Sequence, residues 1–78
     1  MSAREVLAEL DRLAISVFYR GGGAGPRTRL EVGVGRERAY PGLLRALEER
    51  TPELLGLASF EASRHTRGTY VRRPGGAA

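Results

Sequence analysis

Apolar residues recur at steps of three and four over the first thirteen positions, which predicts an amphipathic helix. Ser2 and Glu5 stand at the spacing of a capping box, in which each side chain bonds the other residue's backbone amide. The helix is therefore expected to begin after Ser2 and to bury one apolar stripe as core. That stripe is formed by Ala3, Val6, Leu7, Leu10 and Leu13.

The period changes to two after Ala14. Residues 15–20 alternate and are rich in β-branched and aromatic side chains, which predicts a strand. A second alternating run covers residues 28–34, and the glycine-rich segment 21–26 between the two runs cannot be regular structure. We therefore expect an antiparallel hairpin with one face covered by a helix.

Two proline-marked starts predict two further helices. Pro41 suits the first position of a helix whose Leu43, Leu44 and Leu47 point inward. Thr51 and Pro52 then indicate a break near Arg50 and a second start, with the threonine as cap. The short helix that follows should present Leu54, Leu55, Leu57 and Ala58.

The expected architecture is a small α+β domain of αββαα order, with the antiparallel β-hairpin packed on the helices. We divide the chain into this domain, 1–61, and a basic, flexible C-terminal segment, 62–78. For residues 59–73 a helix extension, a late strand through Thr69, Tyr70 and Val71, and a loosely docked tail all remain open. Residues 74–78 are typical of a linker or a disordered end.

Composition argues against catalysis. The 78 residues contain no cysteine and one histidine, which excludes disulfides and thiolate metal sites and leaves little for nucleophile–histidine chemistry. The loop 21–28 approximates a phosphate-binding loop but has Pro26 and Arg27 where glycine and lysine are needed. His65 lies in a polar stretch and is interpreted as solvated. We expect no enzyme activity, cofactor or metal.

Charge is unevenly placed along the chain. All thirteen basic residues are arginine; residues 1–61 hold nine arginines and nine acids, so the net charge of +4 belongs to residues 62–78. Arginines interleaved with an aromatic suit nucleic acid, and a solubilising tail is the competing interpretation. The candidate nucleic-acid residues are Arg64, Arg67, Tyr70, Arg72 and Arg73, beside His65.

The hairpin offers a second candidate surface, because a two-stranded sheet has exposed edges that can template an added strand. A basic edge favours an extended acidic peptide, although the same arginines could simply protect the edge against aggregation. The candidate peptide-binding residues are Arg27, Arg29, Glu31, Val32 and Arg36. Leu7, Leu10, Leu30 and Leu43 are the expected supporting core.

Several segments together resemble the TubC-type N-terminal docking domain of nonribosomal peptide synthetases and hybrid assembly lines. The resemblance covers residues 3–58, through Val-Leu-Ala-Glu-Leu-Asp-Arg-Leu-Ala-Ile at 6–15, Val-Phe-Tyr-Arg-Gly at 17–21, Arg-Leu-Glu-Val at 29–32, Tyr-Pro-Gly-Leu at 40–43 and Glu-Leu-Leu-Gly-Leu at 53–57. The chain departs from that family in its longer glycine-rich loop, in Ala14 where glycine is common, and in Pro52.

The resemblance implies a non-catalytic docking module that captures the acidic C-terminal peptide of an upstream synthetase subunit, and it makes a homodimer an expectation. The alternatives are a small nucleic-acid-associated protein and a phage or accessory protein that blocks a larger complex. The chain carries no recognisable targeting signal and no run of about 20 apolar residues, so we expect a cytoplasmic protein without membrane contact.

Overall fold

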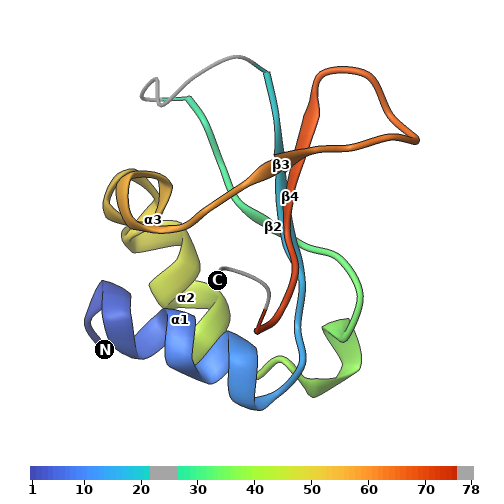
Figure 1. Cartoon of the computed structure of the whole chain (residues 1–78). Helices are drawn as coiled ribbons and strands as arrows, with labels where there is room; N and C mark the ends of the chain where they lie inside the picture. The colour runs from blue at the N-terminus through green and yellow to red at the C-terminus, as the bar shows by residue number, and fades with distance from the viewer. Residues whose placement is uncertain (22–26, 76–78) are drawn as a thin grey trace.

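The computed structural model describes residues 1–21 and 27–75; the remainder of the glycine-rich loop and the last three residues lie outside the described residues. Three helices lie against one side of a four-stranded sheet (Figure 1). In chain order the elements are α1 (Ala3–Arg12), β1 (Val17–Arg20), β2 (Glu31–Val32), η1 (Arg36–Arg38), α2 (Pro41–Glu49), α3 (Thr51–Leu57), β3 (Glu61–Ala62) and β4 (Thr69–Arg72).

Both ends of α1 are set by local hydrogen bonds. The predicted capping box is present: the Glu5 amide donates to Ser2 Oγ at 3.2 Å, and the Ser2 amide donates to Glu5 Oε1 at 2.9 Å. Hydrogen bonds to the Glu5 carboxylate lower its pKa, the bond from the Ser2 backbone amide first and the bond from the Ser2 side chain second. The N-terminus of α1 is therefore capped by residues adjacent in the sequence.

The C-terminus of α1 is a Schellman motif. The Ile15 amide donates to Leu10 O at 2.8 Å and the Ala14 amide to Asp11 O at 3.2 Å, while Leu10 and Ile15 are both fully buried. Ala14 takes a φ of +54°, a left-handed conformation in which glycine is usual. This turn directs the chain from α1 straight into β1.

The helices α2 and α3 begin where prolines predict, but one detail differs. Thr51 does not cap α3; it is buried in the first turn, and its hydroxyl donates to Leu47 O at 2.7 Å, at the end of α2. Arg50 occupies the cap position instead. The threonine therefore joins the two helices.

The sheet is entirely antiparallel, in the order β2-β1-β4-β3. The predicted hairpin is present, with Val17 opposite Val32, but β2 is shorter than the alternating run 28–34. The other side of β1 is occupied: β4 pairs along its whole length, with Tyr19 opposite Tyr70. Of the three possibilities for residues 59–73, the structure therefore shows strands, β3 and β4. The segment 62–78, expected to be flexible, instead contains β4 and Ala62 of β3.

The core lies between the helices and one face of the sheet. Leu10 and Leu43 are buried as expected, while Leu7 and Leu30 are half-buried against the same cluster. Leu44, expected inward, is 43% exposed. The buried apolar residues are Ala3, Val6, Leu10, Ile15, Val17, Leu43, Ala46, Leu47 and Leu54.

An ion pair joins the last strand to the first helix. Arg72 is 4% exposed, and its Nη1 and Nη2 donate to the two carboxylate oxygens of Asp11 at 3.0 and 3.2 Å. The Gly75 amide adds a bond of 2.8 Å to Asp11 Oδ1. Burial alone raises the pKa of Asp11, but the bonds from Arg72 and Gly75 and the arginine's charge outweigh it and hold the pKa below its ordinary value.

Candidate functional site

The strand β2 forms one edge of the sheet, so within residues 1–21 and 27–75 one side of its backbone has no neighbouring strand. Phe18 lies opposite Glu31, and the Gly33 amide donates to Ser16 O at 2.8 Å. Antiparallel pairs alternate, so Glu31 and Gly33 direct their backbone groups toward β1, whereas the amide and carbonyl of Val32 point away from it. The open edge therefore offers a donor and an acceptor to an added strand.

A bulge bends the chain just beyond this edge. The Ser16 amide donates to Val34 O at 2.9 Å, so Gly33 and Val34 together oppose the single residue Ser16. The Val34 amide donates to Ser16 Oγ at 2.8 Å, and a Cβ on Gly33 would lie 2.9 Å from that oxygen. Ser16 and the glycine thus fix where β2 ends.

The turn after the bulge places Arg36 beside the edge. Gly35 has a φ of +89°, and a Cβ there would lie 2.7 Å from Ala14 O. In the short helix η1, Arg38 donates from Nε to Leu13 O at 2.5 Å and from Nη2 to Ala14 O at 2.8 Å. These bonds anchor η1 to the end of α1 and leave Arg36 at its start, facing the groove described next.

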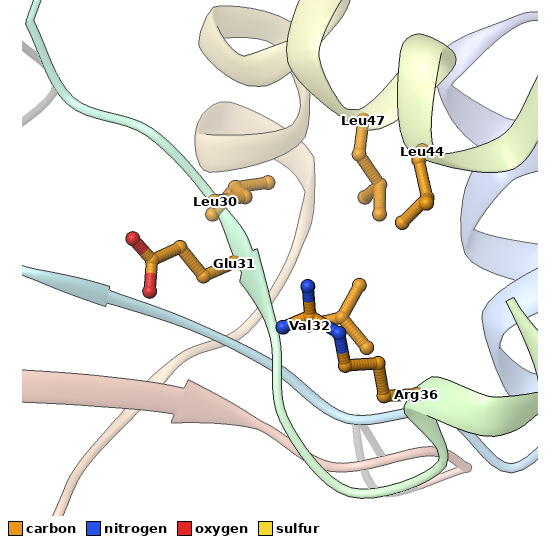
Figure 2. A pocket seen from close by; sticks show the side chains of 6 residues that line it. All are labelled: Leu30, Glu31, Val32, Arg36, Leu44 and Leu47. Atoms are coloured by element: carbon orange, nitrogen blue, oxygen red, sulfur yellow. The ribbon is translucent and has the colours of Figure 1, made fainter. Parts of the chain in front are cut away.

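A groove of about 330 Å³ separates the β2 edge from α2. Figure 2 shows Leu30 and Val32 on the side of the strand that faces α2, with Leu44 and Leu47 opposite them. The Arg36 guanidinium reaches toward Val32, and the Glu31 side chain points away from the helix. The groove therefore combines open strand backbone, an apolar wall and one cation.

The five predicted peptide-binding residues are only partly brought together. Val32 and Arg36 line the groove, and Glu31 contributes backbone while its side chain turns to the other face. Arg29 is exposed and forms an ion pair of 3.1 Å with Glu48 of α2. Arg27 is exposed and lies in the turn that precedes β2, outside the groove lining.

The helical wall of the groove was missed by sequence reasoning. Leu44 and Leu47 were both assigned to the core, but only Leu47 is buried. The signal was available in the helical period: Leu43, Ala46 and Leu47 form one stripe, and Leu44 lies to its side. An exposed leucine beside an open strand marks this wall.

The candidate nucleic-acid residues are divided by the structure. Arg64 and Arg67 are exposed in the loop between β3 and β4. Arg72 is excluded, because it is buried against Asp11 and not available to a phosphate. The prediction that Arg72 belongs to a nucleic-acid-binding set was therefore wrong.

The other two members of that set are already in contact with protein groups. Tyr70 stacks on Tyr19 with ring centroids 5.1 Å apart, and Phe60 meets Tyr19 edge-on at 4.9 Å. Arg73 lies 3.6 Å from a carboxylate oxygen of Glu61, with both side chains well exposed. An exposed pair of this kind is weak, so Arg73 can exchange partners.

Over residues 1–21 and 27–75 no cluster of three or more metal-ligating His, Cys, Asp or Glu side chains occurs. Within the same ranges, none of the helices has the length and apolar character required to span a membrane. No protein-family model, curated protein or solved structure matches this chain.

Proposed function

We propose that this protein is a non-catalytic docking module that binds a short acidic C-terminal peptide of a partner protein by strand addition to β2. The observation that carries the proposal is that the edge strand β2 borders the groove: Val32, whose amide and carbonyl point away from β1, lines it together with Leu44 and Arg36. Main-chain hydrogen bonds would supply affinity, and the groove would contact every second side chain of the added strand.

The groove favours a peptide in which an apolar residue and an acid are close together. Leu30, Val32 and Leu44 offer a partly exposed apolar surface. Arg36 is exposed and has no ion pair among the described residues, so its guanidinium is available to a carboxylate. The resemblance to TubC-type docking domains makes an upstream synthetase subunit the proposed source of the peptide.

Titration with a synthetic peptide tests the proposal. The probe is a ten-residue peptide of alternating leucine and glutamate with a free C-terminal carboxylate, and backbone amide shifts are followed by NMR. We expect shifts concentrated at residues 30–36 and on the Leu44 side of α2. Arg36→Glu should weaken binding by about tenfold or more, because attraction becomes repulsion.

The matched control is Arg4→Glu, which makes the same charge change on an exposed position of α1. This variant should bind the peptide nearly as the unmodified protein does. Equal losses of peptide affinity in the two variants would show that binding depends only on net charge. Amide shifts confined to β3 would show that the peptide binds at the opposite edge of the sheet. Either result would contradict the proposal. Light scattering on the free protein tests the expected homodimer separately.

A further inference from the structure

The topology gathers basic residues from two distant segments at one end of the sheet. Because β1 and β3 run in one direction and β4 in the other, the C-terminus of β1 and the loop between β3 and β4 lie at the same end of the sheet. The Gly21 amide donates to Gly68 O at 2.9 Å and joins them. In Figure 1 the β3–β4 loop and the end of β1 lie away from α1.

Neither segment contains an acid. Residues 20–30 hold three arginines, and residues 62–69 hold two arginines and His65, with no aspartate or glutamate in either stretch. Arg29 is paired with Glu48, but the other four arginines form no ion pair within the part of the chain that the structure describes. We call the end of the sheet that carries Arg20, Arg27, Arg64 and Arg67 the basic end.

The loop that carries two of these arginines has a defined backbone. Ser63 Oγ accepts hydrogen bonds from the amides of His65 and Thr66 at 3.1 and 3.2 Å. The Ser63 amide donates to Thr69 O at 2.7 Å, and the Thr69 amide donates to Thr66 O at 3.2 Å. Arg64 and Arg67 are thus presented from a fixed turn and not from a loose tail.

A hollow adjoins the basic end at the β3 edge. It measures about 340 Å³ and is lined by Glu61, Ala62, Arg64, His65 and Arg73. Arg73 can leave its 3.6 Å contact with Glu61 for a stronger anionic partner, since both groups are exposed. The hollow therefore adds one guanidinium, that of Arg73, beside Arg64.

From these observations we propose that the basic end binds the phosphodiester backbone of a nucleic acid, a function separate from peptide docking at β2. Guanidinium groups match phosphate oxygens through paired N–H donors. A membrane surface is disfavoured, because the large exposed apolar residues in the described ranges are Met1, Val34, Leu44 and Leu57, none in the two basic segments. Binding without an apolar anchor should be sequence-independent and steeply salt-dependent.

Fluorescence anisotropy with a labelled oligothymidine of about 16 nucleotides tests the inference. We expect binding at low salt. The logarithm of the association constant should fall linearly with the logarithm of the salt concentration. The double variant Arg64→Gln and Arg67→Gln should lower affinity by about tenfold and make that slope shallower by about 1 to 1.5, through the loss of two phosphate contacts.

The matched control is the double variant Arg4→Gln and Arg45→Gln, which removes from the helices two exposed arginines that form no ion pair among the described residues. It has the same net charge as the test variant and should retain affinity and slope. Absence of binding at low salt, or equal losses in both variants, overturns the proposal. Tighter binding to phosphatidylcholine vesicles containing phosphatidylserine than to the oligonucleotide would assign the surface to membranes instead. Peptide binding at β2 should be unchanged by the Arg64 and Arg67 substitutions.

Discussion

The two ends of the sheet use the same residue type in opposite ways. At the end next to α1, Arg72 is 4% exposed against Asp11, and Arg38 donates to the carbonyls of Leu13 and Ala14. At the other end, Arg64 and Arg67 extend from a turn without an ion pair among the described residues. Arginine closes the fold at one end and remains available to a ligand at the other.

The difference follows from what each end of the sheet offers as a partner. The last turn of a helix has carbonyl groups without intrahelical donors, and α1 also places Asp11 there. Arg72 pairs with Asp11, and Arg38 donates to the carbonyls of Leu13 and Ala14, which directly follow α1. The two segments of the basic end contain no acidic residue, and its four arginines form no ion pair among the described residues. The positions of the acidic residues, and not the net charge, therefore indicate which arginines are available to a ligand.

The largest effect should come from separating Arg72 from its partner. Asp11→Asn leaves a buried guanidinium without a charged acceptor, and we expect it to lower the free energy of unfolding at neutral pH by about 2–3 kcal/mol. Denaturant unfolding measures the loss. Glu9→Gln is the control on the same helix: it breaks the more exposed pair with Arg12 and should cost no more than about 0.5 kcal/mol.

The same pair predicts an acid dependence. Because the pKa of Asp11 is lower in the folded protein than its ordinary value of 3.8, its contribution is complete above the unfolded-state value. It is lost as pH falls through the lower folded value. The unmodified protein should therefore lose its advantage over Asp11→Asn as pH falls below about 4. A difference between the two proteins that stays constant down to strong acid would contradict the assigned role.

Near α1, the starts of the helices and the β1–β2 hairpin were predictable, because local sequence patterns determine them. The capping box at Ser2, the helix starts at Pro41 and Thr51, and the pairing of Val17 and Phe18 with β2 all follow from local sequence patterns. The pairing of β4 with β1 was not predictable, because the strand period of Thr69, Tyr70 and Val71 does not specify a partner. A flexible tail and a central strand neighbour have the same local pattern.

The candidate sites show the same limit. The open edge of β2 was predicted from the hairpin, and Val32 and Arg36 are at its groove. The burial of Arg72 depends on a carboxylate 61 positions away, which no local pattern contains. The junction of Gly21 with Gly68 is likewise non-local. Sequence therefore located charge and periodicity, and topology decided which charges are accessible.

A smaller, stabilising effect is expected where the sequence conflicts with the turn it forms. Ala14 holds a left-handed φ of +54° at the end of α1. Ala14→Gly should raise the free energy of unfolding by about 0.5–1 kcal/mol, because the relief of steric strain exceeds the added entropy of the unfolded glycine. Ala8→Gly, an exposed position within the same helix, should instead cost about 1 kcal/mol. Destabilisation by both substitutions would show that the Ala14 turn stores no strain.

The smallest effect is expected at the basic end. Arg64→Gln and Arg67→Gln, alone or together, should change the free energy of unfolding by less than about 0.5 kcal/mol, because both side chains are exposed and form no ion pair within the described residues. Thermal and denaturant unfolding measure this against Asp11→Asn in the same buffer. A loss approaching that of Asp11→Asn would mean that these arginines also hold the fold together. An unchanged stability combined with reduced oligonucleotide affinity would separate the two ends: arginines that stabilise lie beside α1, and arginines that bind lie opposite.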